Sequence, residues 1–270
     1  MTEILLDISD PALGPADTLA ALTGIVADAI DNAPRSQQAA IGPSEIGHPC
    51  DRRLAYKLND HPKVNSGRLA WKPAIGTAVH AWKQEIVERW NWDNPMPDGG
   101  PRFIVEGRVH VGDAGNQPIT GSSDVYDRLT ATNGDYKIVG GDRLRHYREH
   151  GPGDQYRIQA HAYGRGYALL GYRVRWVAIW FLPRDREFDK AYFWYEPYDE
   201  QIALDALTRL DGIAKLVASL GPAAPGLLGT ADAFCTSCRY YGPGSKDLTK
   251  ACPGDPAVRT ASPSLQSLIA

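Results

Sequence analysis

Residues 121–137 read GSSDVYDRLTATNGDYK, and this stretch decides how the predicted sheet is assembled. It overlaps two segments with the alternating pattern of strands, residues 119–127 and 135–139. Because successive side chains of a strand point to opposite faces, Asp135 and Lys137 project to the same side. Taken alone, such a carboxylate–lysine pair is most often a surface ion pair. Its meaning therefore depends on which residue of the neighbouring strand lies beside it.

The pairing of these two strands has two solutions. Asn133-Gly134 is a favoured two-residue hairpin turn, and pairing about it would leave Asp124 about 27 Å from Asp135 at ~3.3 Å per residue. A four-residue loop over residues 128–131 instead sets Asp124 opposite Asp135, about 5 Å apart. Both carboxylates could then bind one hard cation. We predict this second register, with Asn133 and Gly134 inside a strand.

The rest of the chain alternates between helical and strand patterns. Further strands are predicted at residues 103–111, 173–182 and 190–195, and helices at 17–33, 44–56, 75–90, 154–170 and 202–220. This order predicts an α/β fold, a mixed sheet flanked by helices. We expect three parts: an acidic helical segment (1–40), the main domain (41–255) and a tail (256–270).

The composition is that of an ordinary globular protein, with 43% hydrophobic and 23% charged residues in 270. No apolar run approaches the ~20 residues of a membrane helix, and the N-terminus lacks the order of a secretory signal. We therefore expect a cytoplasmic protein without a membrane span.

The net charge of −3 is unevenly distributed. Residues 1–34 carry six acids and no base, whereas residues 137–175 carry eight bases against three acids. A local basic surface can bind phosphates even on a slightly acidic protein; the alternative is an ordinary solvated face. Aromatic and basic residues also alternate over residues 147–180, as suits single-stranded DNA. We expect phosphate contacts from Arg145, Arg148 and Arg157, and core packing from Trp176 and Trp180.

Four short motifs follow one another along residues 76–163. They are Gly76-Thr77-Ala78-Val79-His80, Gly121-Ser122-Ser123-Asp124, Asp135-Tyr136-Lys137 and the segment from Gln159 to Tyr163. In this order they resemble the G-x-x-x-H, G-x-x-D, (D/E)-x-K and Q-x-x-x-Y motifs of the RecB-like PD-(D/E)xK nuclease superfamily. Each motif is weak alone, but the ordered set is specific. Ile138 departs from the family, which often has Thr or Ser there.

The resemblance implies a restriction-endonuclease-like fold and a set of site residues. The ligands of Mg²⁺ or Mn²⁺ would be His80, Asp124, Asp135 and the main-chain carbonyl of Tyr136, and the catalytic group would be Asp124, Asp135, Lys137, Gln159 and Tyr163. Hard divalent ions prefer such oxygen-rich sites, and one imidazole is compatible with Mn²⁺. The alternatives are a core histidine for His80 and an amphipathic helix face for Gln159 and Tyr163. Glu106 is expected to face solvent.

The four cysteines are Cys50, Cys235, Cys238 and Cys252. Their spacing favours metal ligation over disulfides in a cytoplasmic protein, and four thiolates suit either Zn²⁺ or an iron–sulfur cluster. One cysteine before the motifs and three after them resemble the CRISPR-associated and AddB-type iron–sulfur exonucleases. That resemblance implies a 4Fe–4S cluster that joins the N- and C-terminal parts like a staple, with zinc as the alternative. The thirteen residues before Cys252 form a longer gap than in that family.

These observations predict a metal-dependent DNA exonuclease. It would act on single strands or DNA ends, in phage or bacterial recombination, repair or DNA processing. One alternative is a DNA-binding assembly partner, in spacer acquisition or recombination, whose nuclease site is incidental. Another is a zinc-stapled scaffold.

Overall fold

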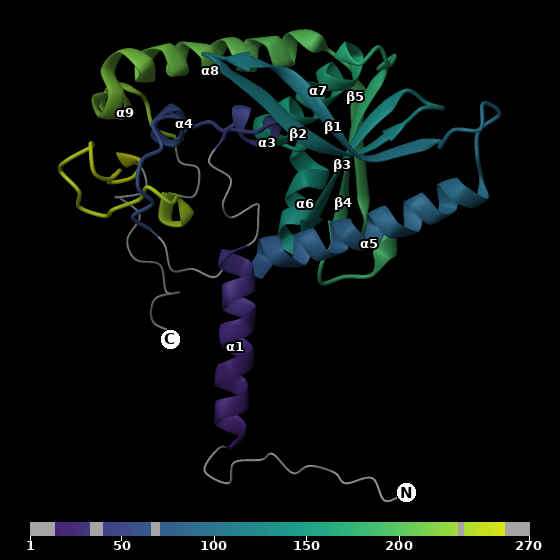
Figure 1. The fold of residues 1–270 in the computed structure, drawn as a ribbon, viewed down its shortest axis with the longest axis horizontal. Helices are drawn as coiled ribbons and strands as arrows, with labels where there is room; N and C mark the ends of the chain where they lie inside the picture. The colour runs from purple at the N-terminus through teal and green to yellow at the C-terminus, as the bar shows by residue number, and fades with distance from the viewer. Residues whose placement is uncertain (1–13, 33–39, 66–70, 232–234, 257–270) are drawn as a thin grey trace, which may run out of the picture. The chain divides into compact units, whose positions relative to one another are not determined.

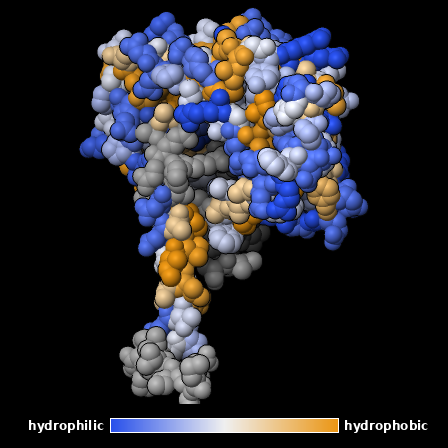
Figure 2. Space-filling model, turned by 45° about the vertical axis from the view of Figure 1, so that its right-hand side comes forward, coloured by the Kyte–Doolittle hydropathy of each residue, from blue (hydrophilic) through white to orange (hydrophobic). Residues whose placement is uncertain are grey.

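The computed structural model describes residues 14–32, 40–65, 71–231 and 235–256. They fall into two units, of which the smaller holds described residues 14–32 and 71–74. Its main element is helix α1 (Pro15–Asp31), along which hydrophobic side chains gather (Figure 2). The helix begins two residues before the predicted start, because Pro15 occupies its first turn and Asp17 accepts a hydrogen bond from the Gly14 N–H at 2.7 Å. The predicted tail lies outside the described residues except for Pro256.

The larger unit is built on one mixed five-stranded sheet (Figure 1). Its strands are β1 (Phe103–Ala114), β2 (Gln117–Asp127), β3 (Thr132–Val139), β4 (Trp176–Pro183) and β5 (Tyr192–Pro197), in the order β1-β2-β3-β4-β5. Only β3 and β4 pair in parallel; the other neighbours are antiparallel. Helices α6 (Gly141–His150) and α7 (Asp154–Leu169) connect the parallel pair. The predicted α/β fold with a mixed sheet and flanking helices is confirmed.

Helix α7 covers one face of this sheet, packing against β1, β3 and β4, and α8 (Glu200–Leu220) packs on α7 and β1. The main core lies between them. Small residues of α7 allow a close approach: a Cβ at Gly166 would lie 2.5 Å from a methyl carbon of Val109. Helix α7 starts where the sequence predicts, because Asp154 can stabilise the first turn.

The single helix predicted at residues 44–56 is wrong. The structure has two short helices, α3 (Pro43–Ile46) and α4 (Asp51–Leu58). Gly47 and Pro49 interrupt the helix because proline cannot continue it and disfavours a helical residue before it. Arg52 of α4 donates to the Pro225 carbonyl at 2.9 Å, which ties α4 to α9 (Ala224–Leu227) after the 3₁₀ turn Gly221–Ala223.

Helix α5 (Trp71–Asp93) extends beyond the predicted range at both ends. Its residues 75–93 belong to the larger unit. Near its C-terminus, Asn91 donates to the Phe103 carbonyl at 2.7 Å and accepts from the Phe103 N–H at 3.0 Å. This two-sided pairing fixes the end of α5 to the start of β1. Among the described helices, none has both the length and the apolar character needed to cross a membrane.

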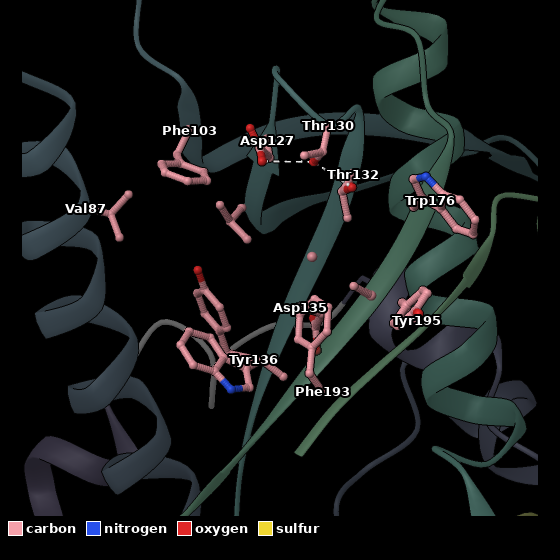
Figure 3. A pocket seen from close by; sticks show the side chains of 14 residues that line it. Val87, Phe103, Asp127, Thr130, Thr132, Asp135, Tyr136, Trp176, Phe193 and Tyr195 are labelled. Carbon is pink, nitrogen blue, oxygen red and sulfur yellow. Dashed lines mark hydrogen bonds between the residues drawn. The ribbon is translucent and has the colours of Figure 1, made fainter. Parts of the chain in front are cut away.

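The expectation that Trp176 and Trp180 pack in the core is wrong. On β4, Val177, Ile179 and Phe181 are buried on the side of α6 and α7, whereas both tryptophans are half-buried and point to the other face. There they line a cavity of about 520 Å³ between α5 and the sheet (Figure 3). Strand alternation places the three apolar side chains on one face of β4 and the two tryptophans on the other. Helix α7 packs on the first face, so the apolar side chains are the ones that it buries.

Candidate active site

The register of β2 and β3 brings the two predicted carboxylates to facing positions. Strand pairing joins Asp127 to Thr132 and continues to Val125 and Gly134, so the next opposite pair is Asp124 and Asp135. Regular pairing stops at this point. The Asp124 carboxylate accepts a hydrogen bond from the Tyr136 N–H at 2.5 Å. The predicted register is confirmed.

The same register places Asn133-Gly134 within β3 instead of at a turn. Asn133 is fully buried, accepting from the Ser123 hydroxyl at 2.7 Å and donating to the Ala160 carbonyl at 3.1 Å. These bonds satisfy its amide inside the protein, as a buried polar group requires. Tertiary hydrogen bonding therefore outweighs the local turn preference.

A third carboxylate, that of Glu106, lies in line with the first two. Strand β1 pairs with β2 through Val105–Val125 and Gly107–Ser123, which sets Glu106 across from Asp124. Glu106 has a left-handed backbone, φ +48°, and interrupts the pairing. Such a conformation costs about 1–3 kcal/mol in a non-glycine residue and is typical of functional sites. The side chain is 33% exposed, so it is not the freely solvated residue that the sequence predicts.

His80 reaches this group from α5. Its Nδ1 lies 3.2 Å from Asp124 Oδ1 and 3.9 Å from Glu106 Oε1. One donor atom from each of His80, Glu106 and Asp124 lies within 4.8 Å of the other two, a spacing at which all three can bind one cation. Burial lowers the pKa of His80, but the neighbouring carboxylates of Asp124 and Glu106 outweigh it and raise this pKa to about 9. A cation would therefore displace a proton from His80.

Asp135 and Lys137 form the second half of the site. The Lys137 ammonium pairs with Asp135 Oδ2 and donates to Gln159 Oε1 at 3.1 Å, while Gln159 Nε2 donates to Asp135 Oδ1 at 2.7 Å. Asp135 is almost completely buried, and burial raises its pKa to about 6, although Lys137 opposes the shift. The three side chains thus form a closed ring of contacts beside Asp124.

Tyr163 differs from Gln159, although both lie on α7. Tyr163 is buried in the main core, and its hydroxyl would be 3.0 Å from a Cβ placed at Gly121. The absence of a side chain at Gly121 therefore leaves room for the Tyr163 hydroxyl. Through this contact the motif that begins at Gly121 packs against the motif that ends at Tyr163. A Cβ at Gly76, by contrast, would meet no described atom within 4 Å. Gln159 contacts Asp135 and Lys137, whereas Tyr163 packs in the main core, and the assignment of Tyr163 to the catalytic group stays a prediction.

Lys83 was not among the expected residues. It lies three residues after His80 on α5 and is buried, with its ammonium 3.6 Å from the Tyr136 ring centroid and 4.0 Å from that of Trp180. Burial lowers the pKa of Lys83 to about 8, partly opposed by Asp124. The i, i+3 spacing to His80, which puts both on one helix face, is the sequence signal that could have identified it.

The three expected phosphate-binding arginines have partners within the protein. Arg145 lies 3.4 Å from Asp142 and is largely exposed. Arg148 donates to the Lys190 carbonyl at 2.7 Å, and Arg157 pairs with Glu196 at 2.6 Å. Arg145 and Arg148 are exposed, and the assignment of the three arginines to DNA stays a prediction.

The four cysteines line one small cavity together with side chains that include Arg53 and Tyr56. None of them is in a disulfide. Near the 3₁₀ turn Cys235–Ser237, the Cys238 N–H donates to the Cys235 carbonyl at 2.9 Å and the Asp255 N–H lies 3.4 Å from Cys235 Sγ. Tyr56 stacks on Tyr240 at 5.2 Å. The segments before and after the sheet therefore meet at the cysteines.

The fold and the site define a mixed α/β protein with clustered carboxylates, a histidine and a lysine. No protein-family model and no curated protein matches the chain. The solved structure of SSO0001 is similar at 13% identity and a TM-score of 0.46, over 81% of this chain and 94% of that one.

An alkaline exonuclease, LHK-Exo from Laribacter hongkongensis, is similar at 12% identity and a TM-score of 0.45, over 72% of this chain and 93% of that chain. Its complex with dAMP gives 13% identity, a TM-score of 0.45 and coverage of 71% and 93%.

Proposed function

We propose that this chain is a metal-dependent nuclease that hydrolyses phosphodiester bonds of DNA, as an exonuclease on single strands or ends. The observation that carries the proposal is the position of Asp124 opposite Asp135, with His80 beside the first carboxylate and Lys137 beside the second. The ordered motifs of residues 76–163 support DNA as the substrate, in phage or bacterial recombination, repair or processing.

The donor set fits a hard divalent cation. It comprises carboxylates from three neighbouring strands and one imidazole, which suits Mn²⁺ or Mg²⁺. Buried Asp135 Oδ2 makes no hydrogen bond in the described structure and is held only by its ion pair with Lys137. We propose His80, Asp124, Asp135, the Tyr136 carbonyl and also Glu106 as ligands. When bound, the ion would polarise the phosphate and lower the pKa of a water molecule.

Lys137 has the position of a residue that stabilises developing charge. Its ammonium is held by Asp135 and Gln159, so its orientation is set before a substrate arrives. A preorganised donor of this kind stabilises the additional negative charge on the phosphoryl oxygens in the transition state. Gln159 acts as a positioning residue, because it bonds both members of the ion pair.

We also propose that the cysteines hold a 4Fe–4S cluster. All four thiols line one small cavity, and none of them is in a disulfide. One thiol comes from the segment before the sheet and three come from the segment after it, the placement along the chain on which the resemblance to iron–sulfur exonucleases rests. Zinc, which four thiolates also suit, is the alternative. The cluster would be structural, since hydrolysis needs no electron transfer.

The test is degradation of end-labelled single-stranded and duplex DNA with Mg²⁺ or Mn²⁺. Asp135→Asn and Lys137→Met are each expected to lower the rate at least about 10²-fold, because each removes a group at the developing charge. Asp205→Asn, a matched change at an exposed position of α8, should leave it unchanged. Equal degradation by wild type and Asp135→Asn would end the proposal.

Direct Mn²⁺ titration by calorimetry tests the ligands separately from activity. Glu106→Gln should weaken binding by about 10-fold or more, whereas Asp205→Asn should not. Unchanged affinity in Glu106→Gln would remove Glu106 from the ligand set and leave the other residues in place.

A further inference from the structure

The cavity of about 520 Å³ has Asp135 in its lining (Figure 3). It lies on the face of the sheet opposite α7. Helix α5 contributes Val87 to its wall, and the sheet contributes aromatic rings from four strands. These rings are Phe103, Tyr136, Trp176, Trp180, Phe193 and Tyr195. Its volume is in the range of small-molecule binding sites.

The aromatic surface is accessible. Phe193 is 54% exposed and Tyr195 is 60% exposed. Both lie on the same face of β5, the more exposed of its two faces. The neighbouring rings Trp176 and Tyr195 meet edge-on at 5.9 Å, and Phe193 and Tyr195 are tilted at 6.1 Å. None of these pairs is stacked face to face, so the rings do not cover one another. Exposed large apolar groups gathered in one place indicate a binding surface.

The cavity adjoins the candidate active site through Tyr136. The Tyr136 ring lines the cavity, while its N–H bonds Asp124 and its ring lies 5.9 Å from that of His80. The buried ammonium of Lys83 lies over the same ring and over Trp180. A nucleotide with its phosphate at the carboxylate cluster would therefore have its base directed along this aromatic wall.

We propose that this cavity binds unpaired nucleobases of the DNA strand whose phosphate is at the carboxylate cluster; this inference rests on the proposed nuclease function. Flat aromatic rings stack on bases of any identity. The threonine hydroxyls of the cavity are engaged at its edge, because Thr130 donates to Asp127 at 2.9 Å and lies 2.8 Å from Thr132. The six aromatic rings make stacking the main contact that the cavity offers to a base. Because a duplex keeps its bases paired, the site selects single strands and frayed ends.

The test compares two single strands of about 20 nucleotides, a length beyond the ~4–16 nucleotides of typical single-strand sites. One strand carries thymine bases and the other has the same backbone with abasic positions. Affinity is measured by fluorescence anisotropy with the full chain, with Ca²⁺ in place of Mg²⁺ to suppress cleavage. Wild type should bind the strand with bases at least about 10-fold more tightly, since stacking contributes about 5- to 150-fold per base.

Variants locate this preference in the cavity. Phe193→Ala combined with Tyr195→Ala should remove most of it, whereas Tyr195→Phe, which keeps a stacking ring, should retain it. Trp92→Ala is the matched control, because Trp92 is an 86% exposed aromatic on α5 that does not line the cavity. The substituted side chains are exposed, so the variants should fold.

Equal affinity of wild type for both strands, or no binding of either, would overturn the inference. Retention of the full preference in the Phe193/Tyr195 double variant would overturn it as well. Metal-dependent cleavage is scored separately. Base-dependent binding without cleavage would contradict the nuclease function alone, and cleavage without base dependence would contradict the cavity assignment alone.

Discussion

At the residue scale, the backbone conformation of Glu106 sets the direction of its carboxylate. Its φ of +48° turns the carboxylate out of the alternation of β1 and towards His80. Glycine would adopt this conformation at no steric cost, so the chain keeps glutamate against a local strain of about 1–3 kcal/mol. Strain retained at a position that adds a third carboxylate to the cluster supports its assignment as a ligand.

His161 offers a prediction on pH that is independent of the cation site. It is fully buried, with its Nε2 2.6 Å from Glu196 and its Nδ1 accepting from the Asp199 N–H at 3.1 Å. Burial lowers the pKa of His161 below its usual 6.5, outweighing Glu196, which raises it. The unfolded chain then binds more protons than the folded one, so this contribution to stability is complete above pH 6.5 and is lost as the pH falls below it.

Urea unfolding at pH 7.5 and pH 5 measures this effect. The difference in unfolding free energy between wild type and His161→Gln should be smaller at pH 5 than at pH 7.5. A difference that is equal or larger at pH 5 would mean that His161 is protonated in the folded protein.

At the scale of elements, the close packing of α7 on β1 leaves no room for a side chain at Gly166. Alanine at Gly166 would place its Cβ 2.5 Å and 2.6 Å from two carbons of Val109. We expect Gly166→Ala to destabilise the protein by about 1–3 kcal/mol, because a β-branched neighbour on a paired strand cannot move aside.

The matched control is Gly212→Ala on α8. A Cβ there meets no described atom within 4 Å, so the gain in helix propensity should stabilise the protein by about 0.5–1 kcal/mol. Chemical denaturation of both variants measures the change in unfolding free energy, which should be a decrease for Gly166→Ala and an increase for Gly212→Ala. Stabilisation by Gly166→Ala would show that α7 does not pack on β1 as closely as the structure has it.

The strands could be predicted where the alternation of apolar and polar residues in the sequence matches the burial of their side chains. Strand alternation and the loop at residues 128–131 predict β2, the end of β3 and their register, which the structure confirms. Helix α6 was missed because it buries little apolar surface, chiefly Leu144 and Tyr147. Strand β3 begins at Thr132, before the alternating pattern of residues 135–139, as the predicted register requires, and buried partners that no local pattern reveals hold Asn133 there.

At the scale of the whole molecule, the four cysteines line one cavity although Cys50 and Cys235 are about 185 residues apart in sequence. Cys50 precedes α4, and Tyr56 of α4 donates to the Leu248 carbonyl at 2.6 Å in the segment that holds the other cysteines. If a cluster closes this junction, Cys238→Ser should lower bound iron and expose residues 235–256 to limited proteolysis. Thr236→Ala, at an exposed neighbouring position, should do neither.

Metal analysis of anaerobically purified protein measures iron and zinc in both variants and in wild type. Iron with the brown colour of a cluster is the expected result for wild type and Thr236→Ala. Zinc in place of iron would contradict the cluster and support a zinc staple.

The strand pattern, the loop length and the residue types available for a cation can be predicted from the amino-acid sequence, because they depend on local alternation and short-range spacing. The sequence therefore predicted that Asp124 would face Asp135 and that Lys137 would accompany Asp135. Three other features depend on long-range packing: Glu106 joins the cluster, Tyr163 packs in the core, and Trp176 and Trp180 line an open cavity. Alternation assigns side chains to one face or the other, but the packing of α5 and α7 decides which face is buried and which stays accessible.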